Sequence, residues 1–300
     1  MQDRLESLGG RPLKRLVLPA SHDSAMYESG FLKSLAQTQD LTIYKQLSHG
    51  IRYFDLRPQW HDGRLVIHHG PVQGPDLAEV LQDVRRFARE GHRELVILKF
   101  SHYEGFHDEA YKGLIGQIKA SLGLWLYKSL PRGKRLADIT LAEYVGQTGA
   151  VLVLCDGRYL LEHRSEGIWV YRDWDSQHPE QGDLRIYDQY SNMMTYPAMK
   201  TDQFDKFNRY DGKCKTRRDV PCDLFLLSWT LTPATNVRDY AAEANRNLEA
   251  AVKELKIPNR FGCVVNLLYA DYVDSSKATE IAIQQNEMLS APIIRANLGH

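Results

Sequence analysis

Residues 77–98, LAEVLQDVRRFAREGHRELVIL, contain one complete helix-to-strand unit of the chain. Apolar residues between Leu77 and Ala88 follow the 3.6-residue spacing of a helix with one buried face. Asp76 precedes this run as a candidate N-cap, and Gly91 follows it as a helix stop. Leu95-Val96-Ile97-Leu98 then forms a continuous apolar run, which is typical of a strand buried on both faces.

Similar apolar runs recur along the chain, bounded by turn or charged residues. The expected strands lie at residues 16–18, 51–54, 65–67, 95–98, 151–154, 184–187, 224–227 and 263–268. Helical patterns at residues 110–122 and 239–255 separate some of them. This alternation, without a Pro/Gly/Ser-rich linker, predicts a single α/β domain over residues 1–300, a distorted TIM-type (β/α)8 barrel. The distortion is expected at residues 58–63, which are too few for a helical crossover.

The composition is typical of a soluble globular protein, with 43% hydrophobic and 25% charged residues. Lys+Arg and Asp+Glu are both 38, which argues against a general nucleic-acid binder. No apolar stretch reaches the roughly 20 residues that span a bilayer. The N-terminal residues show no charged segment followed by an apolar one, so we expect a protein that is cytoplasmic or exported without a visible signal.

The four cysteines are too few for a disulfide framework. Cys155 and Cys263 lie in apolar runs, where we expect small buried side chains. Cys214 and Cys222 lie in a polar segment, where a disulfide and a reduced pair both fit. The sequence has no Cys-x-x-Cys or His-Glu-x-x-His motif, so a structural zinc site is not expected.

Polar residues follow several of the expected strands. His22, in Ser21-His22-Asp23-Ser24, follows the first strand, and the carboxyl ends of barrel strands carry active sites. By itself this motif also fits a polar turn. Asp55 and Arg57 are two residues apart and project from the same face of a strand, either as a structural ion pair or as a phosphate site.

Two histidines end the expected third strand. Because adjacent residues of a strand point to opposite faces, only one of His68 and His69 can face the barrel interior, and the spacing does not say which. Asp271 follows the last strand and either orients an imidazole on the neighbouring first strand or caps a helix. Lys99 is either a second cation at the mouth or a snorkelling lysine. Two histidines that exchange base and acid roles, with an arginine for an anion, suit metal-free phosphodiester cleavage.

Three segments of the chain, Leu18–Ser24, Tyr53–Arg57 and Ile67–Pro71, resemble in order and spacing the bacterial phosphatidylinositol-specific phospholipase C family. They are also similar to the metal-independent relatives in eukaryotes that have only the X domain. The resemblance is strongest over residues 14–105 and continues at 151–190 and 222–272. It implies cleavage of phosphatidylinositol, or of an inositol-glycan lipid, to diacylglycerol and a 1,2-cyclic inositol phosphate.

The resemblance also implies a role for each catalytic residue. His22 would be the general base that takes the proton of the inositol 2-hydroxyl, and Asp271 would orient it. Arg57 would stabilise the charge that develops on the phosphate. His69 would protonate the diacylglycerol leaving oxygen.

Asp23 and Asp55 would hold His69 and Arg57 in position relative to each other and to the leaving group. Arg57 stands where the calcium-dependent branch of the family would need a metal ligand. We therefore expect no metal and no cofactor.

Four residues are candidates for binding the inositol ring. The resemblance implies that Arg158 and Asp188 bind ring hydroxyls and that Tyr190 stacks beneath the ring, with Lys99 nearby. For Arg158 a surface role fits equally well. Phe31-Leu32 and the basic stretch from Lys206 to Arg218 are candidates for peripheral contact with a membrane.

Two other functions remain open from the sequence. A glycerophosphodiester phosphodiesterase would keep the fold with another head group, but such barrels need Glu/Asp metal ligands that these motifs do not supply. A lipid-binding barrel without catalysis is the non-enzymatic alternative, although every catalytic position of the family is filled here. We expect a monomer with a lipid substrate and no nucleic-acid partner.

Overall fold

The structure is a computed structural model that describes residues 2–28, 36–214, 220–232 and 236–290. The side chains of residues 158–161 and 179 are outside this description. No helix among the described residues is long and apolar enough to cross a membrane.

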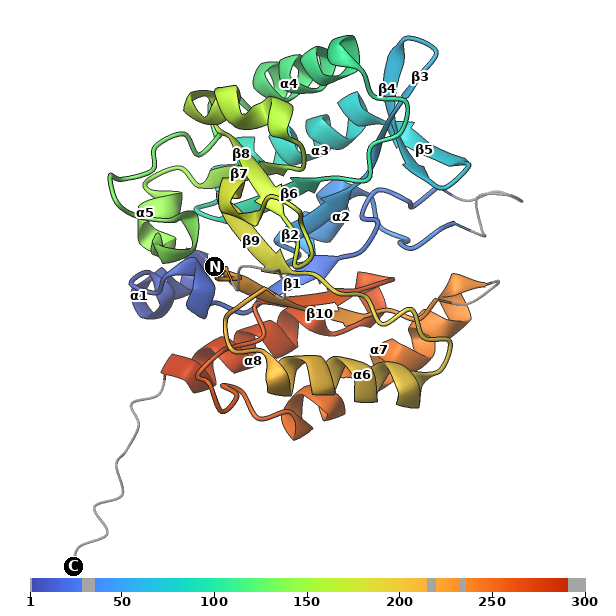
Figure 1. Cartoon of the computed structure of the whole chain (residues 1–300), viewed down its shortest axis with the longest axis vertical. Helices are drawn as coiled ribbons and strands as arrows, with labels where there is room; N and C mark the ends of the chain where they lie inside the picture. Colours follow the sequence, from blue (N-terminus) through green and yellow to red (C-terminus); the bar gives the residue numbers. More distant parts are fainter. Residues whose placement is uncertain (1, 29–35, 215–219, 233–235, 291–300) are drawn as a thin grey trace, which may run out of the picture.

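Eight parallel strands form a closed barrel, as the sequence predicts (Figure 1). Around the barrel they are β1 (Leu18–Ser21), β11 (Leu267–Ala270), β10 (Leu224–Trp229), β9 (Leu184–Tyr187), β8 (Ile168–Arg172), β7 (Ala150–Cys155), β6 (Leu95–Phe100) and β2 (Tyr53–Leu56). The first and last strands are neighbours, with Leu18 paired to Leu267 and Ser21 to Ala270. Residues that follow β1, β2 and β11 therefore meet at one end of the barrel.

The predicted number of barrel strands is correct, but one predicted member is wrong. Residues 65–67 belong to β4 (Arg64–His69), which lies outside the barrel in an antiparallel sheet with β3 (Pro58–His61) and β5 (Val72–Asp76). The short link at residues 58–63 is part of a hairpin, and β2 pairs directly with β6. The barrel strand missing from the prediction is β8, whose aromatic residues and terminal Arg172 hide the apolar run.

Helices surround the barrel, with α3 and α4 on one side and α6, α7 and α8 on the other (Figure 1). The α-helices are α1 (Leu5–Leu8), α2 (Ile43–Ser48), α3 (Leu77–Arg89), α4 (Asp108–Leu122), α5 (Leu141–Val145), α6 (Tyr196–Arg209), α7 (Val237–Glu254) and α8 (Ala278–Ser290). Short 3-10 segments are η1 (Gln2–Arg4), η2 (Leu13–Arg15), η4 (Leu136–Asp138), η5 (Arg158–Glu166), η6 (Pro179–Gln181) and η7 (Val273–Ser275).

Helix α3 shows how the sequence pattern becomes structure. Its apolar stripe is buried, as the 3.6-residue spacing predicts. Gly91 follows it with φ +79°, a left-handed conformation that suits a glycine stop. Asp76 occupies the N-cap position, but its side chain makes no cap hydrogen bond and pairs with Arg64 at 3.0 Å instead.

The apolar core has three parts: the barrel interior, and one layer beneath each group of helices. Side chains that alternate along each strand fill the interior and the outer layers in turn, and each buried Leu or Ile contributes about 1.5–3 kcal/mol. This filled interior leaves polar side chains at the strand ends, where they can form a site.

The cysteines follow the expectations only in part. Cys155 is buried, whereas Cys263 is partly exposed because it precedes β11 instead of lying within it. Cys214 and Cys222 form a disulfide with their Cα atoms 4.9 Å apart. Of the two predicted alternatives for this pair, the structure therefore has the disulfide and not the reduced cysteines.

Gly149, which leads from α5 into β7, offers a test of this packing. Its φ is +83°, and a Cβ there would lie 2.3 Å from the backbone oxygen of His92. Gly133 has a similar φ of +80° with nothing within 4 Å of a Cβ, so it is a matched control. We expect Gly133→Ala to cost about 1–2 kcal/mol of unfolding free energy and Gly149→Ala clearly more. Urea denaturation of both variants measures the difference, and equal losses would contradict the packing described.

Candidate active site

The carboxyl ends of three neighbouring strands bring the predicted catalytic residues together. His22 directly follows β1, Asp271 directly follows β11, and Arg57 directly follows β2. Because β11, β1 and β2 are adjacent in the barrel, residues nearly 250 positions apart in sequence come into contact. Barrel enzymes build their sites at this end.

His22 is held on both sides of its ring. Its Nδ1 lies 2.7 Å from Asp271 Oδ1, and its Nε2 lies 3.1 Å from Arg57 Nη2. A carboxylate only accepts hydrogen bonds, so the contact with Asp271 places a proton on Nδ1. A guanidinium only donates, so the Nε2 lone pair accepts from Arg57. Burial opposes the charged ring, but Asp23 and Asp271 together outweigh it and raise the pKa of His22.

Arg57 is a fixed cation beside this imidazole. Its Nε contacts Asp23 Oδ1, and its Nη2 lies 3.1 Å from Asp55 Oδ2. Burial opposes the guanidinium charge, yet the two carboxylates raise the pKa of Arg57 well above its ordinary value. The guanidinium therefore stays charged at any pH where the protein is folded.

Asp55 is the buried anion at the centre of the site. Its Oδ1 lies 3.2 Å from Lys99 Nζ, and its Oδ2 accepts a hydrogen bond of 2.6 Å from the hydroxyl of Tyr269. Burial favours the neutral acid, but Lys99 and Arg57 hold the pKa of Asp55 well below its usual range. Asp55 is thus an anion compensated from both sides.

One group of possible metal ligands occurs among the described residues at this site. His22, Asp23 and Asp55 each offer a ligand atom, and these atoms lie within 4.8 Å of one another. Arg57, however, contacts both carboxylates, and Lys99 contacts Asp55. A divalent ion would have to displace the guanidinium, so the donor set as arranged does not fit a resident metal.

The two adjacent histidines of β4 have different environments. The ring nitrogens of His68 lie 3.2 Å from Gly70 O and 2.9 Å from His102 O, and the side chain is buried. His69 is about one-third exposed, and its Nδ1 lies 3.4 Å from Asp23 Oδ2. His68 is therefore enclosed by acceptor oxygens of its own loop, including Glu104 Oε2 at 3.1 Å, whereas His69 faces the site.

Three of the four predicted ring-binding residues, Lys99, Asp188 and Tyr190, lie beside this group. Lys99 is fully buried and pairs with Asp188 at 3.1 Å, so it is neither a snorkelling lysine nor a free cation. The ring of Tyr190 lies 6.1 Å from the ring of His22. The side chain of Arg158 lies outside the described part of the structure, so its predicted role stays a prediction.

A cavity of about 270 Å³ opens next to Lys99 and Tyr190. Four carboxylates line it, from Asp156, Asp173, Asp175 and Asp188. Asp173 and Asp175 hydrogen-bond each other, and burial together with Asp175 raises the pKa of Asp173 to about 7. The sequence analysis missed this pair because it follows β8, the strand that was not predicted.

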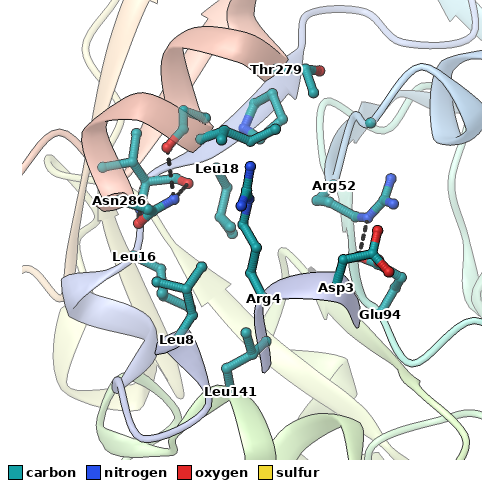
Figure 2. Close-up of a pocket in the computed structure, with 15 residues that line it drawn as sticks. Asp3, Arg4, Leu8, Leu16, Leu18, Arg52, Glu94, Leu141, Thr279 and Asn286 are labelled. Carbon is teal, nitrogen blue, oxygen red and sulfur yellow. Dashed lines mark hydrogen bonds and ion pairs between the residues drawn. The ribbon is translucent and has the colours of Figure 1, made fainter. Parts of the chain in front are cut away.

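A second cavity, of about 240 Å³, lies at the opposite end of the barrel (Figure 2). It is lined by residues that precede the strands, including Leu16, Arg52 and Glu94. Arg52 pairs with Glu94 at 2.9 Å, and Arg4 pairs with Glu287 at 3.0 Å. Arg52, Glu94 and Arg4 are therefore held in ion pairs at this end of the barrel.

The sequence analysis also missed Tyr269, Tyr171 and His102. Tyr269 donates to Asp55, and Tyr171 donates to Asp188 at 2.9 Å. Tyr269 could have been found, because it lies two residues before Asp271 and so shares a strand face with it. Burial and Arg57 lower the pKa of His102, which has a left-handed φ of +54°.

The structure tests the segments predicted to contact a membrane only in part. Phe31-Leu32 lies outside the described residues, as do Lys215, Arg217 and Arg218. Lys206 is buried in α6 and pairs with Asp202 at 2.6 Å, so it does not belong to an exposed basic loop.

Replacing Asp271 tests the electrostatics of His22. We expect Asp271→Asn to lower the pKa of His22, because it removes one of the two carboxylates that favour the charged ring. An NMR titration of the imidazole measures this directly, with Asp62→Asn, an exposed carboxylate, as control. The neutral base then persists to lower pH, so the acid limb of any rate profile moves to lower pH. An unchanged or raised pKa would contradict the assigned contact.

Comparisons with known proteins agree with this geometry. A family model described as phosphatidylinositol-specific phospholipase C, X domain, matches residues 10–144. A PI-PLC X-box domain-containing protein of Dictyostelium discoideum is 27% identical over 239 residues, covering 73% of this chain and 30% of the relative. A 1-phosphatidylinositol phosphodiesterase of Listeria monocytogenes is 33% identical over 101 residues, covering 32% of this chain and 31% of the relative. The chain thus spans about a third of the length of these two relatives.

Solved structures of bacterial enzymes share the fold. The phosphatidylinositol-specific phospholipase C of Listeria monocytogenes superposes with a TM-score of 0.64 at 21% identity, covering 92% of this chain and 95% of that one. A mutant of the Staphylococcus aureus enzyme superposes with a TM-score of 0.64 at 18% identity, covering 91% and 94%. Residues 10–144 of this chain thus match the phosphatidylinositol-specific phospholipase C X domain, and the barrel as a whole shares the fold of the bacterial enzymes.

Proposed function

We propose that this protein cleaves the phosphodiester bond of phosphatidylinositol, or of an inositol-glycan lipid, to diacylglycerol and a 1,2-cyclic inositol phosphate. The observation that carries the proposal is the contact of His22 with both Asp271 and Arg57 at the barrel mouth. A base, a carboxylate that orients it and a fixed cation thereby meet at one point. The match of residues 10–144 to the phosphatidylinositol-specific phospholipase C X domain supports the enzyme class.

In the first half of the reaction His22 acts as base. When the inositol 2-hydroxyl replaces Arg57 Nη2 as the partner of His22 Nε2, this nitrogen takes the hydroxyl proton, and the oxygen forms a bond to phosphorus. The imidazolium that results is stabilised by Asp271, 2.7 Å from Nδ1. The raised pKa of His22 suits this step, because it strengthens the base near neutral pH.

Arg57 supplies the electrostatic stabilisation. Its guanidinium is already fixed by Asp23 and Asp55, so little reorganisation is needed when negative charge builds on the phosphate oxygens. Arginine also presents several donors in a plane, which suits phosphate oxygens. In this proposal the guanidinium stabilises the negative charge on the phosphate, which a bound metal ion does in metal-dependent phosphodiesterases.

His69 acts as the acid. It gives a proton to the diacylglycerol oxygen as the bond from that oxygen to phosphorus breaks. Asp23 Oδ2 lies 3.4 Å from both His22 Nε2 and His69 Nδ1, so one carboxylate adjoins the base and the acid. Such a bridge keeps the two histidines in a fixed relation across the reacting phosphate.

The alternatives are less well supported. A metal-dependent glycerophosphodiesterase needs free carboxylates, but Arg57 contacts Asp23 and Asp55. A non-catalytic lipid-binding barrel would not need an oriented imidazole beside a guanidinium. We further propose that residues 1–300 act as one domain, as a monomer at a membrane surface. Met193 and Met194 are exposed after β9, in the segment that also carries Tyr190, and are apolar candidates for that contact.

Turnover without a metal tests this proposal. Purified protein in EDTA should release diacylglycerol from phosphatidylinositol, and His22→Ala and His69→Ala should each lose about 100-fold or more in rate. His92→Gln, at the other end of the barrel, is the matched control and should retain the rate. Circular dichroism separates lost activity from lost folding. Strict dependence on calcium, or full activity of His22→Ala, would overturn the proposal.

The acidic cavity predicts which head group is accepted. Asp156 and Asp188 are paired with Arg172 and Lys99, whereas Asp173 and Asp175 bond each other. A phosphate on the inositol ring would enter beside this pair and be repelled. We therefore propose an unphosphorylated ring as the preferred substrate.

A head-group panel measures this preference. We expect phosphatidylinositol to be cleaved at least about 10-fold faster than its 4-phosphate, since about 1.4 kcal/mol of repulsion gives that factor. The preference should grow as pH rises through about 7, where Asp173 loses its proton. The double variant Asp173→Asn/Asp175→Asn should reduce the preference for phosphatidylinositol over its 4-phosphate. Asp138→Asn, at the opposite end of the barrel, should leave this preference unchanged. Equal rates for both lipids would reject the role of this cavity.

A further inference from the structure

Gln39 is a fully buried amide between the ends of the first and last barrel strands. Its Nε2 donates to His22 O at 2.9 Å and to Ala270 O at 3.3 Å. Its Oε1 accepts from the backbone N–H of Val273 at 3.1 Å. Because carbonyl oxygens only accept and N–H groups only donate, these partners allow one orientation of the amide.

The Gln39 amide lies just beyond the last backbone hydrogen bond between β1 and β11. The register between β1 and β11 ends at Ser21 and Ala270, and the next bond is from His22 N–H to Ala270 O at 3.1 Å. Beyond it both chains turn, with Asp23 at φ +38° and Tyr272 at φ +44°. The Gln39 side chain thus supplies the next link between the two strand ends, immediately at His22 and around Asp271.

Gln39 is itself fixed by its neighbours. Its backbone N–H donates to Met26 O at 3.2 Å, and its carbonyl accepts from Gln37 Nε2 at 2.9 Å. The carbonyl of the preceding residue, Thr38, accepts from the N–H of Tyr272 at 2.7 Å. The segment is therefore bound to the turn that carries Asp271 by backbone as well as by side chain.

We propose that Gln39 is a positioning residue that sets the contact between His22 and Asp271. The buried amide bonds the carbonyl of His22 and both flanks of the turn at Asp271, so its loss lets the two strand ends separate. The catalytic consequence rests on the proposed function, whereas the effect on the His22–Asp271 contact does not.

Replacing Gln39 by methionine tests this, because the side chain keeps its length and loses its hydrogen bonds. In the free protein, NMR titration should show a lower pKa for His22 as Asp271 moves away. With phosphatidylinositol, kcat should fall by about 10-fold or more at little change in KM. If Gln39→Met does not fold, Gln39→Asn is the alternative variant, because it keeps the amide but shortens the side chain. For this variant too we expect a lower pKa of His22 and a lower kcat.

Gln46 provides the matched control. It is another fully buried amide in the same region and donates to Ser24 O and Leu41 O, both at 2.7 Å, without touching His22 or Asp271. Gln46→Met should lower thermal stability in a similar way and leave the pKa of His22 unchanged. Equal effects of the two variants on that pKa would overturn the proposal.

A double variant separates positioning from general damage. In an Asp271→Asn background, Gln39→Met should change the pKa of His22 and kcat much less than it does alone, because the contact it supports is already lost. An undiminished effect would reject the role of Gln39. If the wild-type protein cleaves no inositol lipid while the pKa effects appear as expected, the proposed function fails and the positioning role stands.

Discussion

The compensated charge of Asp55 is the constraint on which the site depends. A carboxylate buried at the end of a closed barrel is costly unless cations and donors surround it. Here Arg57, Lys99 and Tyr269 do so, and Lys99 in turn binds Asp188. Each member therefore needs the others: Arg57 stays in place because Asp55 is ionised, and Asp55 is ionised because Lys99 and Arg57 are present. A partial set would leave an unpaired charge inside the barrel.

Much of the fold and of the candidate site could be predicted from the sequence. Continuous apolar runs identify seven of the eight barrel strands, because strands buried on both faces need no polar residues. The spacing of Asp55 and Arg57 correctly predicts a shared face. The sequence pattern did not predict β8, because Trp169, Tyr171 and Arg172 interrupt the aliphatic run. The pair Asp173 and Asp175 was missed with it.

Other features could not be predicted because they depend on contacts between distant segments. The spacing does not distinguish His68 from His69, and only the resemblance favours His69; the contact of His69 with Asp23 joins distant segments. The hairpin position of β4 likewise required the pairing of β2 with β6. Lys99 looked like a surface or mouth residue, since nothing in its neighbourhood in sequence shows that Asp188 lies beside it. Burial of a lysine is a property of the assembled barrel.

The antiparallel sheet that carries His69 has a mechanical consequence. The proposed base, His22, and Asp271 are attached to neighbouring strands of the closed barrel, whereas the proposed acid, His69, belongs to a separate sheet beside it. Small rigid shifts of that sheet would alter the distance from His69 to a leaving group while leaving the His22–Asp271 pair untouched. In the proposed reaction the two proton transfers would therefore involve two structural units, the barrel and the β3–β4–β5 sheet, which are in contact through His69 and Asp23.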